Sequence, residues 1–309
     1  MTPIVRDLRA ADPVDAEAFA EVRRRALPFM VSTAESLLHD ATHATPDAHY
    51  RQLVAEADGE VIGTVQMGIA DDSPVPGQGY LNVYVHPEHL GRGAGTLLVR
   101  TAEERLTAVG AKRLLSWVLD TPENRAFAER RGYTPSRSAH FLRLDLAHGT
   151  LPPPRTPPEG VELRTAADFA DDPRPLFALD AEASADEPGD LDALFDDYEL
   201  WLAETYHHPL LDHGLSTVAV VDGTPVAFTA ARTDGRDRYF TGMTGTARAF
   251  RGQGLAKLTK NDSLHRARAA GYREAFTGND SDNGPMLAVN KWFGYEVCAT
   301  EVRHVRELG

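Results

Sequence analysis

The segment Arg251-Gly252-Gln253-Gly254-Leu255-Ala256 has the residue types and spacing best suited to binding a charged ligand. It follows a run of β-type residues, 239–246, and precedes a helical pattern over 255–270. A strand that leads through a glycine turn into a helix presents free backbone N–H groups at the positive end of a helix dipole, which suits a phosphate or diphosphate. Glycine lets the backbone approach such a ligand without an intervening side chain.

Two common phosphate-binding motifs do not fit this turn. No Gly-Lys-Ser/Thr follows, which excludes a P-loop, and the third glycine of the dinucleotide fingerprint is missing. A similar turn, Leu90-Gly91-Arg92-Gly93-Ala94-Gly95, stands in the first half of the chain and also lacks that third glycine at the required spacing. The chain therefore carries two related turns, neither of which is of the dinucleotide type.

The two turns belong to a repeat that spans the chain. Its other landmarks are Leu8–Asp12, which reappears as Leu163–Asp168, Asp58-Gly59, which reappears as Asp222-Gly223, and Gly132-Tyr133, which reappears as Gly294-Tyr295. Asp-Gly between two β-type runs is a strong hairpin signal, because both positions tolerate positive φ. Four landmarks in the same order indicate a duplicated domain.

A proline-rich segment, 151–158, separates the two copies. Proline fixes φ and withholds a hydrogen-bond donor, so this composition predicts a stiff, extended linker. A length of 309 residues also fits two domains of ordinary size. We therefore predict an N-terminal domain over 1–150 and a C-terminal domain over 159–309.

Each half predicts the same order of elements: helical material, a hairpin, a strand, the glycine turn, a helix, a strand, a short helix and a final strand. In the first half the strands are 81–85 and 114–119, and the helix carries Leu98, Ala102, Leu106 and Val109 at helical spacing; in the second half the elements are 239–246, 255–270 and 274–277. The pattern is mixed α/β and predicts two tandem domains, each a mixed sheet flanked by helices.

The composition excludes several classes of protein. A net charge of -14 opposes binding to nucleic acid, and a single cysteine, Cys298, excludes a disulfide framework and a cysteine-rich zinc site. No apolar run approaches the roughly 20 residues of a membrane span, and the start lacks an apolar signal core. We expect a cytoplasmic protein without a membrane segment, either a monomer or a homodimer.

The turn at 251–256 resembles the acetyl-CoA loop of the GNAT superfamily of N-acetyltransferases, whose pattern is Gln/Arg-x-x-Gly-x-Gly/Ala. The resemblance extends upstream through Thr244-Gly245-Thr246, downstream through 279–290, and closes at Phe293-Gly294-Tyr295. The N-terminal copy keeps the glycines, and its later part from Asp120 to Asn124 also resembles the family, but Leu90 stands where the family has Gln or Arg. The resemblance implies a tandem member whose C-terminal domain is the active one and whose N-terminal domain is degenerate.

This resemblance implies acetyl-CoA, or another acyl-CoA, as cosubstrate. In the family the fourth and fifth strands of the sheet splay apart, and the pantetheine arm inserts there along the fourth strand. The cofactor-binding residues implied for the second domain are Thr244, Gly245, Thr246, Arg251, Gly252, Gln253, Gly254, Leu255, Ala256, Asn283 and Asn290. A second site in the first domain would use Val83, Val85, Gly91, Arg92, Gly93, Ala94 and Gly95.

The family reaction is direct attack of an amine on the acyl thioester in a ternary complex, assisted by backbone amides that polarise the carbonyl. Many relatives place a tyrosine four residues before the final glycine, where it can protonate the departing thiolate; here that position is Asn290, and Ala128 in the first copy. Solvent, another hydroxyl or an unassisted thiolate remain open as alternatives. Asp234 and Asp237 are the candidates for a general base, although Asp234 precedes Gly235 and also suits a plain turn.

The segment 171–204 is strongly acidic, including Asp180, Glu182 and Asp186, and in the family this region roofs the acceptor pocket. A cationic small-molecule amine is therefore one hypothesis for the acceptor, and a solvated acidic face is the other. A non-catalytic acyl-CoA-binding or regulatory protein is the alternative function, because the tyrosine is missing and the Leu90 turn is degenerate. A dinucleotide oxidoreductase ranks third.

Several other residues favour structural roles. His207-His208 and Asp212-His213 match no compact metal-site spacing, so no metal is expected. Cys298 is expected to be a core thiol, and Trp292 and Phe293 to pack the short helix. Lys257 and Lys260, on the helix after the turn, are expected to be solvated or to meet the CoA phosphates.

Overall fold

The computed structural model, which describes residues 2–71, 73–186 and 197–308, divides into two compact units. Unit 1 comprises Met1–Ala139 and Ala299–Gly309, and unit 2 comprises His140–Cys298. The proline-rich segment 151–158 thus falls within unit 2, and the last residues of the sequence belong to unit 1. The compact units therefore divide the chain differently from the predicted boundary between 150 and 159.

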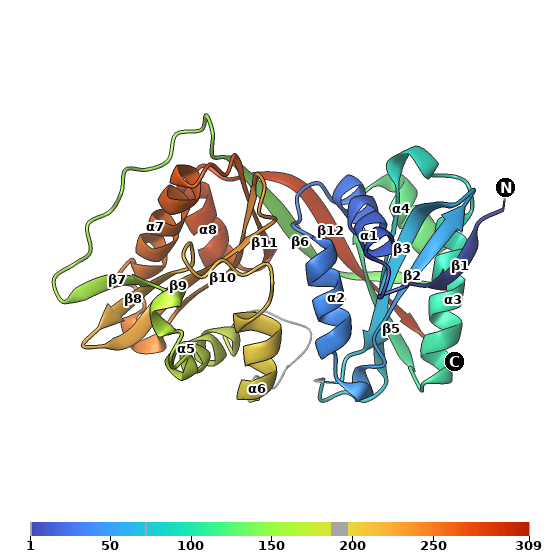
Figure 1. Cartoon of the computed structure of the whole chain (residues 1–309), viewed down its shortest axis with the longest axis horizontal. Helices are drawn as coiled ribbons and strands as arrows, with labels where there is room; N and C mark the ends of the chain where they lie inside the picture. The colour runs from blue at the N-terminus through green and yellow to red at the C-terminus, as the bar shows by residue number, and fades with distance from the viewer. Residues whose placement is uncertain (1, 72, 187–196, 309) are drawn as a thin grey trace. The chain divides into compact units, whose positions relative to one another are not determined.

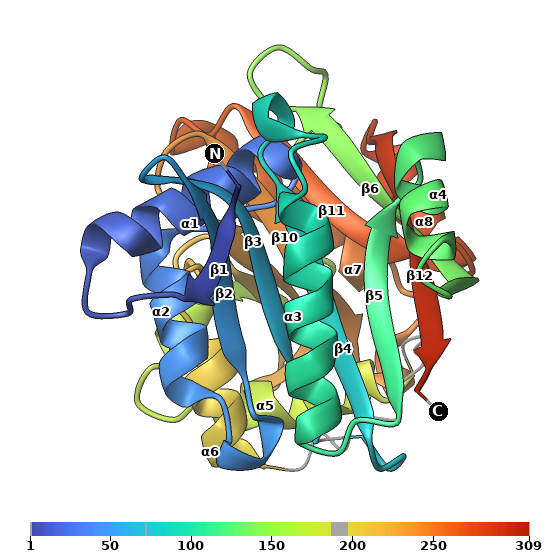
Figure 2. The same ribbon diagram turned by 90° about the vertical axis from the view of Figure 1, so that its right-hand side faces the viewer.

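Unit 1 is a mixed sheet with helices on both faces (Figure 2). Its elements in chain order are β1 (Ile4–Asp7), α1 (Pro13–Ala26), α2 (Ala34–His43), η1 (Pro46–Ala48), β2 (Arg51–Ala57), β3 (Glu60–Ile69), β4 (Gln78–Val85), η2 (Pro87–His89), α3 (Ala94–Ala108), β5 (Arg113–Leu119) and α4 (Pro122–Glu129). The sheet order is β1-β2-β3-β4-β5, and only the β4–β5 pair is parallel among these. Helix α3 packs on one face through Leu98, Ala102 and Leu106, and α1 and α2 cover the other through Phe19 and Leu37.

Unit 2 repeats this plan (Figure 1). Its elements are β7 (Val161–Thr165), η3 (Ala166–Phe169), α5 (Arg174–Ser184), α6 (Tyr198–Trp201), a π-helical turn η4 (Leu202–Tyr206), β8 (Thr217–Val221), β9 (Thr224–Thr233), β10 (Arg238–Thr246), η5 (Arg248–Phe250), α7 (Leu255–Ala269), β11 (Glu274–Asp280) and α8 (Gly284–Trp292). The sheet order is β7-β8-β9-β10-β11, with β10 and β11 parallel. Helix α7 packs on one face, and α5 and α6 cover the other.

Two long strands complete the sheets by exchange. Strand β6 (Thr134–Asp145) begins in unit 1 and ends in unit 2, whereas β12 (Glu296–Glu307) begins in unit 2 and ends in unit 1. In unit 1, residues 301–307 of β12 pair antiparallel with β5, and in unit 2 the neighbour of β11 is β6. Each unit therefore takes the strand beside its fifth position from the other half of the sequence.

The predicted turns form as their residue types require. Asp58 and Gly59 between β2 and β3 have φ of 56° and 82°, and Asp222 and Gly223 between β8 and β9 have φ of 48° and 80°. The left-handed conformation at both central positions matches the twist of a two-residue hairpin. The helix predicted in the first half ends one residue before Val109, which is 41% exposed and caps α3 instead of packing beneath it.

The proline-rich segment packs on α7 and is not a free connector. Asn261 on α7 accepts a hydrogen bond from Arg155 N (2.9 Å) and donates one to Pro152 O (3.2 Å). His265, one turn later, also contacts Pro152 O at 2.8 Å. This second covering explains why α7 buries polar side chains on more than its sheet-facing side.

Residues near the end of the chain that were expected to be buried or packed differ in their exposure to solvent. Cys298 is exposed, so the prediction of a core thiol is wrong; its sulfur donates a hydrogen bond to Phe141 O (3.3 Å). Phe293 is fully buried as expected, whereas Trp292 is 40% exposed. Among the helices of the described residues, none has the length and hydropathy needed to cross a membrane.

We predict that ending the chain after Cys298 destabilises unit 1 selectively. Strand β5 would lose the whole antiparallel ladder from Glu301 to Glu307, and Val305 and His304 would leave the core. Hydrogen exchange should show amide protection in β5 reduced by at least ~10-fold, while β8 and β9 keep theirs. Equal protection of β5 in the shortened and full chains would contradict the strand exchange.

Candidate functional site

The neighbouring parallel strands β10 and β11 part at a defined residue pair. Their pairing runs from Arg238 opposite Glu274 to Thr241 opposite Thr277, where it ends. At the same point the pairing of β10 with β9 shifts register between Thr241 and Met243, so Gly242 is an extra residue. A bulge of this kind bends the strand and increases its local twist. Beyond Thr241, the edge of β10 that faces β11 is therefore available to another chain or ligand.

A pocket of about 320 Å³ occupies the region where the strands part. Its walls come from the second half of β10, from β11, and from the first turns of α7 and α8. The lining residues are Ala183, Asp186, Thr241, Gly242, Met243, Thr244, Gly245, Thr246, Arg251, Ala256, Lys260, Thr277, Gly278, Asn279, Asn283, Pro285, Met286 and Val289. The pocket thus combines a free strand edge with the start of a helix.

The glycine turn brings backbone donors to one end of this pocket. Gly252 and Gly254 have φ of 78° and 79°, a conformation that L-residues adopt at a cost. Gly254 is the N-cap of α7, and no side chain caps the free N–H groups of that helix. Arg155 Nη2 lies within 4 Å of where a Cβ on Gly254 would stand, and Lys257 is on the first turn of α7. Backbone donors and two cations therefore surround the turn, which suits a diphosphate.

Arg251 is held at the end of β10 by two contacts. Its Nε donates to Thr246 O (3.1 Å), and its Nη2 pairs with Asp186 Oδ2 (2.7 Å). Asp186 also pairs with Arg248 through both carboxylate oxygens. The two guanidinium groups lower the pKa of Asp186 to about 2. This carboxylate therefore stays ionised and orients both arginines at the edge of the pocket.

The structure brings part of the expected cofactor set together. Six of these residues line the pocket, namely Thr244, Gly245, Thr246, Arg251, Ala256 and Asn283. Gly252, Gln253 and Gly254 form the adjoining turn, and Leu255 is buried in the core beneath it. Asn283 Oδ1 caps α8 by accepting from Met286 N (3.2 Å). Asn290 is fully buried and does not appear among the lining residues.

The candidates for a general base lie elsewhere. Asp234 and Asp237 stand before the first residue of β10, whereas the pocket lies at the last residues of that strand. Asp234 Oδ1 accepts hydrogen bonds from the backbone N–H groups of residues 236, 237 and 238. This is the geometry of a turn, so neither carboxylate is placed to act on a group in the pocket.

Comparison with known proteins shows which family the chain resembles in sequence. The model of the acetyltransferase (GNAT) family matches residues 16–133 and again residues 176–295. The chain belongs to the GNAT acetyltransferase family. Its two matches make it a tandem member, and like its family it is an acyl-CoA-dependent N-acetyltransferase.

Relatives with similar sequences are bacterial. The chain is 39% identical to a protein of Frankia casuarinae named mycothiol acetyltransferase, over 49% of this chain and 42% of that protein. It is 25% identical to a protein of Nocardiopsis dassonvillei with the same name, over 91% of this chain and 89% of that one.

Solved structures show the same fold. A tandem GNAT protein from the clavulanic acid biosynthesis pathway superposes with a TM-score of 0.74 at 21% identity, covering 99% of both chains. A GCN5-related N-acetyltransferase from Sphaerobacter thermophilus superposes with a TM-score of 0.70 at 23% identity, covering 99% of this chain and 95% of that one. At this level of identity the likeness concerns the fold.

The first GNAT copy, in unit 1, lacks the bulge. Strands β3 and β4 pair without a register shift from Gly63 opposite Val85 to Ile69 opposite Gly79. Beyond the last β4–β5 pair, Asn82 Oδ1 accepts a hydrogen bond from Trp117 N (3.0 Å), so a side chain bridges the parting strands. Leu90 is 65% exposed at the turn. Of the residues expected for a second site, Val83, Val85 and Ala94 pack in the core, and Gly91, Arg92, Gly93 and Gly95 belong to the turn or first turn of α3.

Sequence reasoning missed the most unusual residue of the pocket. Lys260 on α7 is fully buried, so the expectation of a solvated lysine is wrong. Its Nζ donates to Asn290 Oδ1 (2.5 Å) and lies 4.9 Å from the centre of the Tyr295 ring. Asn290 Nδ2 donates in turn to Asn279 Oδ1 (2.5 Å). Burial alone lowers the pKa of Lys260 to about 7.

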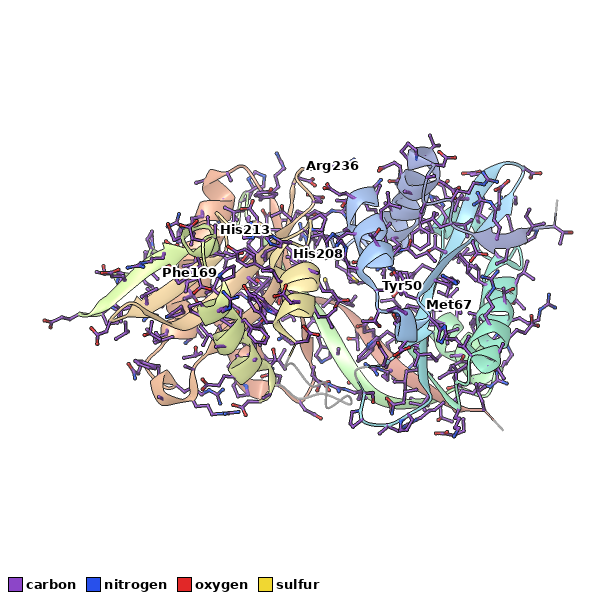
Figure 3. All side chains as sticks on the ribbon, turned by 60° about the horizontal axis from the view of Figure 1, so that its bottom comes forward. Tyr50, Met67, Phe169, His208, His213 and Arg236 are labelled. Carbon is purple, nitrogen blue, oxygen red and sulfur yellow. The ribbon has the colours of Figure 1, made fainter. Side chains whose placement is uncertain are left out.

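The histidines outside the pocket have structural contacts. His213 Nε2 lies 2.8 Å from Tyr206 O, and His208 Nδ1 accepts from Leu210 N (3.2 Å); Figure 3 labels both rings. Within the described ranges, no group of three or more potential metal ligands comes together.

We predict that Gly245→Ala destabilises the fold around the pocket. A Cβ there would stand 2.6 Å from Ala183 Cβ on α5 and 2.6 Å from the Phe228 ring, so α5 or β9 must shift. Such overpacking costs about 1–3 kcal/mol, which chemical denaturation would detect. Gly284→Ala is the matched control, because Gly284 is exposed and a Cβ there meets nothing within 4 Å. Equal stability of the two variants would contradict the prediction.

We also predict that the free energy of unfolding rises between pH 7 and pH 9. The folded-state pKa of Lys260 is lowered to about 7 from 10.5, so in this window the unfolded chain binds a proton at Lys260 that the folded chain does not. Stability then increases with pH, by as much as about 1.4 kcal/mol per pH unit. Denaturation of Lys260→Met should lack this rise, whereas Lys291→Met, an exposed lysine on α8, should retain it.

Proposed function

We propose that unit 2 transfers an acetyl group from acetyl-CoA to the amine of a small molecule, by direct attack of the amine on the thioester in a ternary complex. One observation carries this proposal: the pocket opens along the β10 edge just after the bulge and ends at the uncapped start of α7. A ligand with a diphosphate at one end and an extended, amide-containing arm matches both halves of that site.

The diphosphate would bind to the N–H groups of the glycine turn at the positive end of α7. Arg155 and Lys257 add positive charge beside it; their cationic groups lie 5.6 Å and 4.9 Å from the centre of the Trp292 ring. The pantetheine arm would continue along β10 and pair with its free edge as an added strand would. This orientation brings the thioester to the bulge.

Backbone amides of β10 around Met243 and Thr244 would then polarise the thioester carbonyl. Rigid N–H donors stabilise the negative charge of a tetrahedral intermediate because they need no reorganisation. Attack by the amine forms the C–N bond, and collapse of the intermediate expels the CoA thiolate. No covalent enzyme intermediate is required.

The acceptor is proposed to be a small molecule with a primary amine. The relatives with similar sequences reported above are named mycothiol acetyltransferases, which supports a small acceptor rather than a protein. A cationic acceptor has less support, because described carboxylates of the acidic segment have partners: Asp180 accepts from Trp201 Nε1 (2.8 Å), Asp186 pairs with two arginines, and Glu182 accepts from Arg248 N. Glu187, Asp190, Asp192 and Asp196 lie outside the described residues.

One observation favours a non-catalytic, acyl-CoA-binding role for unit 2 instead: Asn290 replaces the tyrosine that protonates the thiolate in many relatives. Thiol release from acetyl-CoA with a panel of polyamines, aminoglycosides and neutral amino sugars separates the two candidates. Turnover with at least one amine supports the enzyme; binding without any thiol release would favour the alternative. Turnover limited to neutral amines would exclude the cationic acceptor.

We predict that Arg251→Ala weakens acetyl-CoA binding by about 10-fold or more. The guanidinium lines the pocket, and charge-assisted hydrogen bonds contribute roughly 1.5–3 kcal/mol. Leu90→Ala at the equivalent position of unit 1 is the control and should change the dissociation constant less than about 2-fold. Calorimetric titration measures both. Comparable effects of the two substitutions would contradict the assignment of the cofactor site to unit 2.

A further inference from the structure

A chain of three polar side chains lies at the wall of the pocket in unit 2. Lys260 from α7, Asn290 from α8 and Asn279 from β11 are linked by hydrogen bonds of 2.5 Å and 2.5 Å. Lys260 and Asn290 are fully buried, and Asn279 is 9% exposed. Lys260 and Asn279 also line the pocket, so the chain reaches the space between the parted strands.

The other copy of the domain shows that the fold does not need these polar groups. The helices α3 and α7 both begin after the second glycine of their turns, which places Val99 at the position of Lys260. The same repeat places Ala128 at the position of Asn290 and Val118 at the position of Asn279. Val99 and Ala128 are buried in the apolar core of unit 1, and Val118 packs against it, partly buried. Unit 2 therefore holds a buried amine and two amides where its own duplicate holds three apolar side chains.

A buried lysine without an anionic partner is unfavourable for folding. In the part of the chain that the structure describes, no carboxylate pairs with Lys260; its contacts are the Asn290 amide and the Tyr295 ring. An ammonium has three N–H donors, and Asn290 uses one. Lys260 also lines the pocket, which indicates a role there that offsets this cost.

We propose that Lys260 is the proton donor for the departing CoA thiolate, and that Asn290 and Asn279 position its ammonium group. This proposal rests on the acyl transfer proposed above and adds a catalytic residue to it. Asn290 occupies the sequence position of the tyrosine that serves many relatives, and its Oδ1 accepts a hydrogen bond from Lys260 Nζ (2.5 Å). The amine of Lys260 would thus take the role that the tyrosine hydroxyl has in those relatives.

The proton balance of the step is complete. As the tetrahedral intermediate collapses, the C–S bond breaks and its electron pair goes to sulfur. One N–H bond of the Lys260 ammonium breaks as an S–H bond forms, which leaves a neutral amine. The acceptor nitrogen, which has formed the new C–N bond, releases its proton to water, and Lys260 takes a proton from water before the next turnover.

The surroundings of Lys260 suit this exchange. Burial lowers its pKa to about 7, so it can hold a proton and release it near neutral pH. Lys260 contacts the ring of Tyr295, and burial raises the pKa of this phenol and of Tyr239 on β10, so both stay neutral. Burial is the sole cause of the lowered pKa of Lys260, with no contribution from a charged neighbour. Glu274 and Asp280 stand at the two ends of β11, and Lys291 is exposed on α8.

The first test measures the thiol of bound CoA and needs no turnover. The thiolate absorbance of CoA bound to the full chain is titrated against pH, with the desulfo-CoA complex subtracted. Pairing of the thiolate with the Lys260 ammonium should lower the thiol pKa clearly below that of free CoA titrated in the same buffer. Lys260→Met should abolish that lowering, and Lys291→Met should leave it unchanged. An identical thiol pKa in the wild type and Lys260→Met would overturn the proposal.

The second test is kinetic. Lys260→Met should lower kcat by about 100-fold while the KM for acetyl-CoA changes less than about 3-fold, because only the proton transfer is lost. The fall of kcat on the alkaline side, present in the wild type as Lys260 loses its proton, should disappear in the variant. A kcat within 2-fold of the wild type, or an unchanged pH profile, would contradict the role.

A second variant distinguishes the loss of the proton donor from a folding defect in both tests. Lys260→Val combined with Asn290→Ala and Asn279→Val gives unit 2 the side chains that already pack at these positions in unit 1. It should fold, bind acetyl-CoA and show the same losses as Lys260→Met. If the wild type releases no thiol with any amine, the proposed acyl transfer is wrong. The thiol titration would still show whether the Lys260 ammonium lies beside the sulfur of bound CoA. If the wild type turns over and both variants match it, the proposal for Lys260 alone fails.

Discussion

The parting of β10 from β11 beside the one-residue bulge at Gly242 is the feature on which the rest of unit 2 depends. With an extra residue between Thr241 and Met243, β10 keeps its pairing with β9 but does not continue alongside β11. The ladder stops at Thr277, next to the bulge, and the part of β10 beyond it lines a pocket. Because β10 leads through the short helix η5 into the glycine turn, the same edge connects the middle of the sheet to the positive end of α7.

The two copies show which parts of the domain maintain the fold and which maintain the site. Both keep the hairpin with Asp-Gly, the helix that begins at a left-handed glycine, and the parallel fourth and fifth strands. Unit 1 lacks the register shift, and Asn82 supplies the hydrogen bond across the strands that a ligand would otherwise provide. An apolar core with Val99, Val118 and Ala128 is enough to hold these elements together. The features found in unit 2 alone are therefore those that a bound cosubstrate would use.

Much of this arrangement could be predicted from local residue types. Asp58-Gly59 and Asp222-Gly223 predict their hairpins because few residue pairs accept left-handed φ twice, and the glycines at 252 and 254 predict the start of α7. Lys260 could not be found in this way. Helix α7 has a polar sequence, and its buried residues include Thr259, Lys260, Asn261 and Ser263, because it is covered by the proline-rich segment as well as by the sheet. Only alignment of the two copies, with Val99 opposite Lys260, carries a signal. The pairing of β5 with β12 could not be predicted either. The two strands lie far apart in the sequence, and such a pairing leaves no local sequence pattern.

The exchange of β6 and β12 also sets the order in which the molecule can be completed during synthesis. The ribosome makes β5 early, but the residues of β12 that pair with it follow the whole of unit 2. While unit 2 is being translated, β5 has a free edge, and such edges pair readily with other chains. Unit 1 thus reaches its final state only after unit 2 has been made. A chain whose synthesis stops within unit 2 contains neither a complete unit 1 nor a complete unit 2. Every such fragment would therefore be incompletely folded in both units.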